Sequence, residues 1–145
     1  MRAALSLVLL LVAGCASSPS TAPVPVTFID APSAILPDNI KGLWGKWSGT
    51  WDSNVHNILV VEYIDQTTAR VVYSWGNRYP ERGPTRGWTR VWGTVEPGVL
   101  RLTLPNSAKV TYRLQSDGTL QGTYEWYGNV SRIGIVKATL HRSQP

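Results

Sequence analysis

Few residues of this chain are of a type that carries out catalysis, and their spacing does not favour it. The 145 residues include two histidines, His56 and His141, and nine Asp or Glu residues. A zinc site needs three or four clustered ligands, and a glycosidase needs two carboxylates facing one cleft. Glu62 and Glu125 could in principle approach each other, but scattered surface carboxylates are the commoner case. We therefore predict a protein that is not an enzyme, with no catalytic residue, no metal and no cofactor.

Tryptophan and tyrosine are the stronger chemical signal. The chain has seven Trp and six Tyr residues but only one Phe. Phenylalanine would fill a core without a polar group to satisfy, so this bias suggests surfaces that are apolar yet hydrated at one edge. Such surfaces suit sugar stacking or a small amphipathic ligand. The structural alternative is a core and end plugs built from aromatic residues.

A group of aromatic and basic residues forms the first candidate contact surface. Trp88, Arg90 and Trp92 share one face of a predicted strand. If that face points outward it is an aromatic–basic patch, and if it points inward Arg90 needs a polar partner. The preceding loop, residues 76–87, is the longest in the domain and carries Arg78, which could meet phosphate or carboxylate groups.

The elements that must position these residues are eight short strands. Runs rich in Val, Thr, Tyr and Trp alternate with turn signals. Connections such as Asp117-Gly118 and Gly128-Asn129 suit two-residue hairpins, and tight connections make neighbouring strands antiparallel. The predicted strands cover residues 46–51, 57–65, 68–75, 88–96, 99–104, 108–115, 119–127 and 130–142.

The strands alternate apolar and polar residues. In the third strand, Ala69, Val71 and Tyr73 share one face, and Arg70 and Ser74 share the other. This alternation is typical of a sheet wrapped around a single core. We predict an all-β fold over residues 38–145, an up-and-down antiparallel eight-stranded barrel. An outer-membrane barrel is disfavoured because these strands are mostly too short and charges flank their apolar positions.

The first fifteen residues resemble a bacterial lipoprotein signal peptide. Arg2 precedes a short apolar run, and Leu11-Val12-Ala13-Gly14-Cys15 resembles a lipobox. The run is too short to span a bilayer and fits the apolar region of a signal peptide. The resemblance implies a signal peptide at residues 1–14 and acylation, such as palmitate, of Cys15, the only cysteine.

The residue after the cysteine bears on the location of the protein. It is Ala16 and not aspartate, which by similarity to enterobacterial lipoproteins favours the outer membrane. More than one acyl chain anchors a protein stably. We expect a lipid-anchored protein of the cell envelope, on the periplasmic face of the outer membrane.

Residues 15–37, the cysteine and the segment after it, are predicted to form a lipidated, flexible linker. It is rich in Pro, Ser, Thr and Ala, and proline disfavours regular helix or sheet interiors. Its apolar residues Val24, Val26, Phe28 and Ile29 could still dock on the domain or form a short first strand.

The partners follow from charge and location. The net charge is +5, but an envelope location argues against nucleic acid. Anionic lipid headgroups or polysaccharide are the expected electrostatic partners, and a solvated basic surface is the alternative. The sequence predicts no oligomeric state.

Residues 42–51 repeat Gly-x-Trp three times, and this opening of an eight-stranded meander resembles the calycin superfamily, which includes lipocalins and avidins. The resemblance covers residues 42–142. In such barrels a tryptophan closes one end, and a basic residue of the last strand packs over it. The resemblance therefore implies a cation–π contact of Arg142 with Trp47 or Trp51. No biotin-binding set carries over.

We expect an envelope protein that binds a small amphipathic ligand or a glycan at an aromatic-lined barrel mouth. The alternative is a barrel with a filled core that docks another envelope protein or a cell-wall polymer. An open cavity lined by Trp and Tyr favours the first, and a solid interior favours the second. The candidate ligand-binding residues are Tyr73, Trp75, Arg78, Trp88, Arg90, Trp92, Tyr124 and Trp126.

Overall fold

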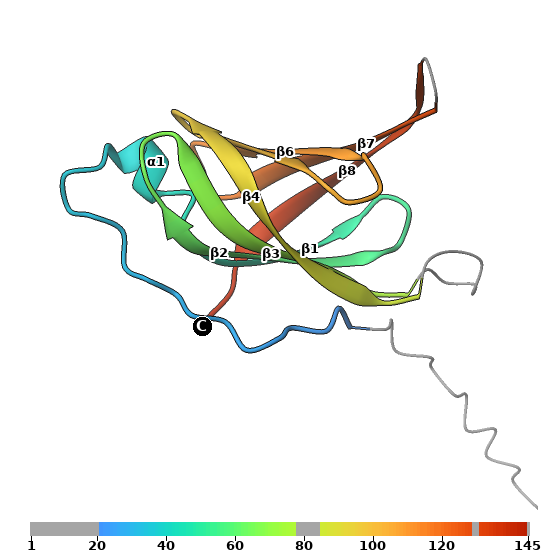
Figure 1. The fold of residues 1–145 in the computed structure, drawn as a ribbon, viewed down its shortest axis with the longest axis horizontal. Coiled ribbons are helices and arrows are strands. Elements are labelled where there is room, and N and C mark those ends of the chain that lie inside the picture. The colour runs from blue at the N-terminus through green and yellow to red at the C-terminus, as the bar shows by residue number, and fades with distance from the viewer. Residues whose placement is uncertain (1–20, 78–84, 129–130, 145) are drawn as a thin grey trace, which may run out of the picture.

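The computed structural model is a closed, eight-stranded antiparallel β-barrel (Figure 1). It describes residues 21–77, 85–128 and 131–144, with residues 132 and 133 described without their side chains. The all-β, up-and-down prediction is confirmed. A short helix, α1 (Asp38–Lys41), precedes the strands. These are β1 (Gly45–Trp51), β2 (His56–Ile64), β3 (Thr68–Trp75), β4 (Gly87–Glu96), β5 (Val99–Thr103), β6 (Lys109–Leu114), β7 (Leu120–Tyr127) and β8 (Arg132–Arg142).

The first and last strands close the barrel. Each strand pairs with the next, and β1 also pairs antiparallel with β8, with Trp47 opposite Arg142 and Trp51 opposite Ala138. Every strand therefore has a partner on both sides, although β4 pairs with β5 only over residues 94–96, at the closed-end part of β4. Closure also fixes which end of the barrel each β1 tryptophan reaches.

The connections define two ends. One end, called here the closed end, holds α1 and the β2–β3, β4–β5 and β6–β7 turns. The other, the open end, holds the β1–β2, β3–β4, β5–β6 and β7–β8 connections. In Figure 1, α1 and the projecting β7–β8 hairpin mark these opposite ends.

The interior contains the apolar faces that the alternation predicts. Ala69, Val71 and Tyr73 of β3 face inward, as do the even-numbered residues of β5, β6 and β7 and, on β8, Val136, Ala138 and Leu140. Side chains fill the closed half. Those with no exposed surface include Leu43, Trp47, Leu59, Leu100, Leu120 and Leu140.

The segment from residue 21 to residue 37, called here the strap, runs along the outer surface of the barrel and ends in a turn at residues 34–36 before α1. Ala22 is buried with Ile58, Val60 and Val72 on the outward faces of β2 and β3, and Ile29 packs against this group. Of the strap residues expected to dock, Ile29 packs on the barrel, whereas Val26 and Phe28 are exposed. The predicted signal peptide and Cys15 lie outside the described residues.

Glu62 ties the strap to the barrel. It is the extra residue of an irregularity in the β2–β3 register and points outward, yet its side chain is only 1% exposed. Arg90 donates to both of its carboxylate oxygens at 2.8 and 3.0 Å, and Arg70 donates at 3.2 Å. The Phe28 backbone N–H of the strap completes the set at 3.3 Å.

Candidate functional site

Trp47 and Arg142 seal the closed end. The Arg142 guanidinium lies 4.3 Å from the centre of the Trp47 ring. It also donates to the carbonyls of Trp44 at 2.6 Å and Gly42 at 2.8 Å. The Trp47 indole donates to the Leu43 carbonyl at 3.0 Å. The contact implied by the calycin resemblance is therefore present, and Trp47 is the tryptophan that makes it.

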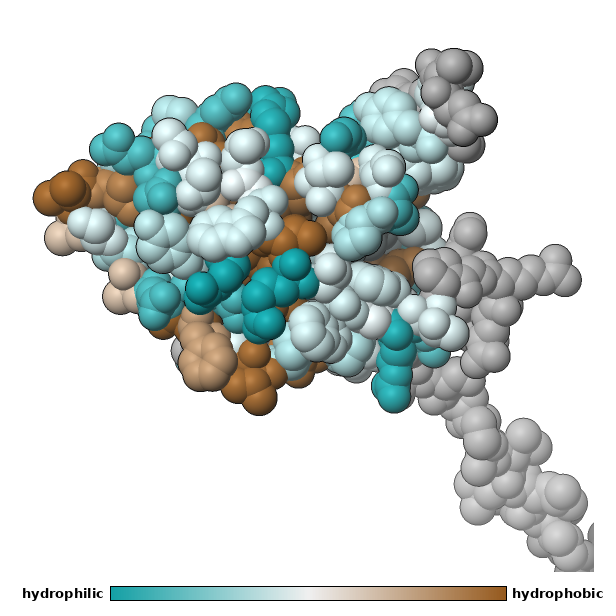
Figure 2. Space-filling model, viewed as in Figure 1, coloured by the Kyte–Doolittle hydropathy of each residue, from teal (hydrophilic) through white to brown (hydrophobic). Residues whose placement is uncertain are grey.

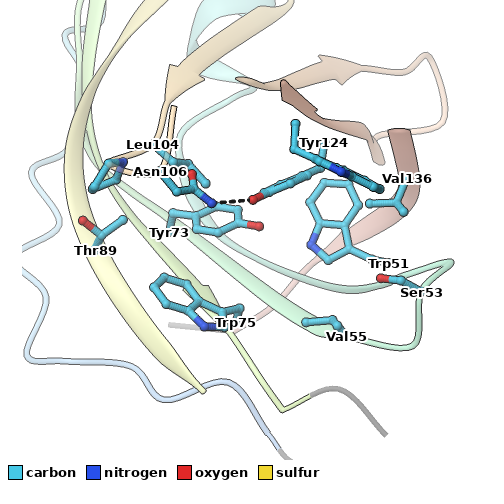
Figure 3. Close-up of a pocket in the computed structure, with 12 residues that line it drawn as sticks. Trp51, Ser53, Val55, Tyr73, Trp75, Thr89, Leu104, Asn106, Tyr124 and Val136 are labelled. Atoms are coloured by element: carbon cyan, nitrogen blue, oxygen red, sulfur yellow. Dashed lines mark hydrogen bonds between the residues drawn. The ribbon is translucent and has the colours of Figure 1, made fainter. Parts of the chain in front are cut away.

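Trp51 does not take that role, because it lies four residues further along β1, about 13 Å away toward the open end. There it lines a cavity of about 600 Å³, a volume within the range of small-molecule sites. Figure 3 shows the cavity between the strands of the open end. The lining residues are Trp51, Ser53, Val55, Tyr73, Trp75, Thr89, Leu104, Pro105, Asn106, Tyr124, Trp126 and Val136.

The aromatic rings of the cavity form one connected wall. Tyr124 lies at its centre, 5.9 Å from Trp51, 6.2 Å from Trp126 and 6.5 Å from Tyr73, measured between ring centroids. Tyr73 lies 5.9 Å from Trp75. Tilted and edge-on pairs at these separations stabilise one another, so the wall is formed before any ligand arrives.

Two of these tryptophans lie over glycines of the neighbouring strand. Trp75 is opposite Gly87, and Trp126 is opposite Gly134. A Cβ at Gly87 would come within 2.8 Å of the Trp75 ring, and one at Gly134 within 2.0 Å of the Trp126 ring. Any other residue at either position would displace the ring, so each glycine sets the shape of the cavity.

The wall carries one unsatisfied polar group. Trp51 Nε1 is buried and has no hydrogen-bond partner. It faces the Tyr73 hydroxyl in Figure 3, but the two form no well-aligned hydrogen bond. Burial raises the pKa of Tyr73 well above its ordinary value, the nearby Tyr124 raises it further, and the Trp51 N–H partly offsets both effects. Tyr73 is therefore a neutral phenol that can donate or accept a hydrogen bond.

Other polar groups near the cavity are already paired. Asn106 donates to the Tyr124 hydroxyl at 2.9 Å. Beside Trp51, the fully buried Tyr112 donates to Asn57 at 2.8 Å, and Asn57 donates to the Ser74 carbonyl at 2.8 Å. The sequence analysis did not identify Asn57. The feature that could have identified it is a polar residue at an inward position of an otherwise apolar strand.

The candidate ligand-binding residues divide into two groups. Tyr73, Trp75, Tyr124 and Trp126 line the cavity. Trp88, Arg90 and Trp92 do not line this cavity, and their role in ligand binding stays a prediction. Their strand turns Thr89 and Val91 inward, so the three side chains lie on the outer face. Arg78 lies outside the described residues.

On the outer face, Arg90 binds Glu62 and lies 5.7 Å from the Trp88 ring centroid. Trp92 is 61% exposed and packs edge-on against Tyr63 at 6.1 Å. The three residues form the aromatic–basic patch that an outward face implies. Arg90 belongs at the same time to the Glu62 cluster under the strap.

The acidic and histidine candidates do not converge. Glu62 and Glu125 lie on the outer faces of β2 and β7, which do not pair with each other. His56 accepts a hydrogen bond from the Ala22 N–H of the strap, and His141 is exposed on β8. Among the described residues, no three His, Cys, Asp or Glu side chains gather as a metal site would require.

Within the described part of the chain, no helix has the length and apolar character needed to cross a membrane. Comparison of the chain with models of known protein families found no family that matches, and comparison with curated proteins found no matching protein.

Proposed function

We propose that this is a lipid-anchored envelope protein that binds a small, flat, amphipathic ligand in the cavity at the open end of its barrel. The observation that carries the proposal is the cavity itself, a preformed space of about 600 Å³ walled by five aromatic side chains. One buried indole N–H in that wall has no partner. A ligand with a hydrogen-bond acceptor beside an apolar ring system would satisfy both features.

The composition of the wall favours an amphipathic molecule over a glycan. A sugar needs a hydrogen-bond partner for most of its hydroxyls, since unpaired polar groups cost free energy when buried. The inner polar groups available are few: the unpaired Trp51 N–H, the Tyr73 hydroxyl and the O–H of Tyr124, whose oxygen already accepts from Asn106. Ser53 and Thr89 add polar groups at the rim.

The anchor and the location rest on the N-terminal sequence. The lipobox-like Leu11-Val12-Ala13-Gly14-Cys15 and the apolar run before it support lipidation of Cys15. The residue Ala16 supports the periplasmic face of the outer membrane. Intact mass of the chain purified from membranes tests the anchor directly, because cleavage before Cys15 and acylation change the mass in opposite directions.

Native mass spectrometry tests the binding function. The full chain is extracted from membranes of its own host in mild detergent and examined for a retained non-covalent adduct. Two variants with the same change are compared, Trp75→Ala in the cavity and Trp92→Ala on the outer face. We expect the wild-type chain and Trp92→Ala to retain the adduct and Trp75→Ala to lose it. Equal retention in both variants, or none in the wild type, contradicts the proposal.

A second candidate, docking of another envelope component, is supported by the outer face. Val26 and Phe28 of the strap are 76% and 69% exposed, near the exposed Trp88 and Trp92 of β4. On the face shown in Figure 2, apolar residues form separate groups among polar ones, and one group follows the lower edge where the strap runs. Loss of co-purifying protein or cell-wall polymer in Trp92→Ala, with the cavity adduct retained, would favour this function.

A further inference from the structure

The strap enters the barrel surface at the open end. The Ala22 N–H donates to His56 Nδ1 at 3.0 Å, and the Pro23 carbonyl accepts from Ser74. Both barrel residues lie where β2 and β3 meet the open end. The strap then runs toward the closed end, where the Asp30 carbonyl accepts from Trp44 at 2.7 Å. The first described residues, 21 and 22, therefore lie at the open end of the barrel, where the cavity opens.

The length of chain between Cys15 and the strap limits which end of the barrel can face the membrane. Six residues lie between Cys15 and Ala22, and the seven Cα–Cα steps from one to the other span at most about 25 Å. If the closed end faced the membrane, Ala22 would stand about one barrel length, ~25 Å, above the surface. The connecting residues would then have to be fully extended. With the open end facing the membrane, no such extension is needed.

The rim of the open end carries exposed apolar side chains. Trp88, Trp126, Tyr127 and Ile135 are between 36% and 45% exposed, and they belong to the open-end halves of β4, β7 and β8. Tryptophan and tyrosine are the side chains that concentrate at the boundary between headgroups and acyl chains. The closed end has one more exposed aliphatic residue, Ile35 before α1 at 86%, but the exposed tryptophans Trp88 and Trp126 belong to the open end, and this aromatic rim fits a bilayer surface.

Charge does not distinguish the two ends. The described connections of the closed end carry Asp38, Asp65 and Asp117, but Lys41 pairs with Asp38 at 3.0 Å, and the nearby Glu96 pairs with Arg101 at 3.3 Å. At the open end the described connections carry Asp52 and Arg86.

We propose that the open end of the barrel is a membrane-docking surface, and that the strap turns it toward the anionic bilayer in which Cys15 is anchored. This inference rests on the lipid anchor of the proposed function. The cavity then opens at the headgroup level, and its ligand class is an amphiphile taken from or delivered to that bilayer. The chemistry that recognises the partner is the aromatic rim, and the partner is a phospholipid surface.

The orientation is measured with two matched reporters. Cys15 is the only cysteine, and its acylated thiol does not react, so Ser131→Cys in the β7–β8 turn and Ser116→Cys in the β6–β7 turn take a fluorophore selectively. The acylated full chain is reconstituted into vesicles of phosphatidylethanolamine and phosphatidylglycerol that contain a headgroup-nitroxide lipid. We expect strong quenching of the Ser131→Cys label and weak quenching of the Ser116→Cys label. Equal quenching, or the reverse order, overturns the proposal.

A variant of the rim tests whether the open end contacts the bilayer or is only held near it by the lipid anchor. Trp88→Ser combined with Ile135→Ser removes two exposed apolar side chains outside the cavity. We expect this pair to lower the quenching of the Ser131→Cys label while circular dichroism stays unchanged. Unchanged quenching would mean that the rim makes no membrane contact, and would overturn the docking surface.

Failure of this inference is distinguishable from failure of the proposed function. Intact mass of the same preparation reports acylation, and fluorescence of added anilinonaphthalene sulfonate reports the cavity. If the probe binds while the two labels are quenched equally, only the orientation is wrong. If Cys15 carries no acyl chain, the proposals of a lipid anchor and of this orientation are both wrong. Binding of the probe then tests the ligand-binding function by itself.

Discussion

At the scale of single residues, two tryptophans of β1 differ in one hydrogen bond. The Trp47 N–H donates to the Leu43 carbonyl, whereas the Trp51 N–H is buried without a partner. An unsatisfied buried donor costs about 1–3 kcal/mol. Such a group in the wall of a cavity is explained if a ligand supplies the missing acceptor.

The change Trp51→Phe tests this explanation, because it keeps an aromatic ring and removes the N–H. We expect the free energy of unfolding of the empty protein to stay constant or to rise by up to about 1 kcal/mol. Binding of anilinonaphthalene sulfonate should weaken about tenfold, which corresponds to one lost hydrogen bond. Binding of N-phenylnaphthylamine, the same ring system without the sulfonate acceptor, should not change. Fluorescence titration measures both affinities.

The matched control is Trp47→Phe at the closed end. It leaves the Leu43 carbonyl without its donor and should lower the free energy of unfolding by about 1–2 kcal/mol. Neither probe should lose affinity. If Trp51→Phe destabilised the protein as much as Trp47→Phe does, the Trp51 N–H would be satisfied in the folded chain, and the explanation would be wrong.

At the scale of elements, Glu62 shows how the strap is held. Burial raises the pKa of this carboxyl, but hydrogen bonds from Arg90, the Phe28 N–H and Arg70, with the charge of Arg90, outweigh burial and lower it below 4.5. Because the pKa is depressed in the folded state, the stabilisation is fully present above the unfolded value. It is lost as the pH falls below about 4.5 and through the folded pKa.

Glu62→Gln should therefore remove a pH-dependent part of the stability. At pH 7 we expect a loss of about 1–3 kcal/mol, reduced from the value for a fully buried pair because both arginines are partly exposed. The difference from the wild type should shrink as urea unfolding is repeated at lower pH. The control is Glu96→Gln, which breaks an exposed pair with Arg101 and should cost at most about 0.5 kcal/mol. A constant difference down to pH 3 would contradict this account.

The pairing of β7 with β8 makes a further prediction. Gly134→Val places side-chain atoms where the Trp126 ring lies, so the ring should leave its place in the cavity wall. We expect weaker binding of anilinonaphthalene sulfonate with unchanged far-ultraviolet circular dichroism. Thr139→Val changes an exposed, outward residue of the same strand and should leave binding intact. Undiminished binding in Gly134→Val would show that Trp126 does not contribute to the site.

These elements also show what the sequence can and cannot predict. The alternation of apolar and polar residues predicted the strands and the inward face of β3, because a buried face needs apolar residues at every second position. It did not settle β4, where Trp88 and Trp92 alternate with Thr89 and Val91, so that either face could be buried. The Glu62–Arg90 pair spans 28 residues, and such distant pairing follows only from the strand register.

At the scale of the whole molecule, the barrel has a packed half and a hollow half. Trp47, Leu43 and Arg142 close one end, and the interior behind them contains fully buried side chains. The connected strands form one closed sheet, so we expect both halves to unfold together. A ligand that binds only the hollow half should then stabilise the entire barrel.

This coupling gives a prediction for thermal unfolding. Anilinonaphthalene sulfonate at about 100 times its dissociation constant should add ~2.7 kcal/mol of stability, equivalent to about 10 °C in Tm for a domain of this size. Circular dichroism of the strands, recorded at a wavelength where the probe is silent, measures the shift. Trp75→Ala should show a much smaller shift at the same probe concentration, and Trp92→Ala should match the wild type. If the probe binds the wild type but Tm does not change, it binds the unfolded chain as well as the folded one, and the cavity is not its site.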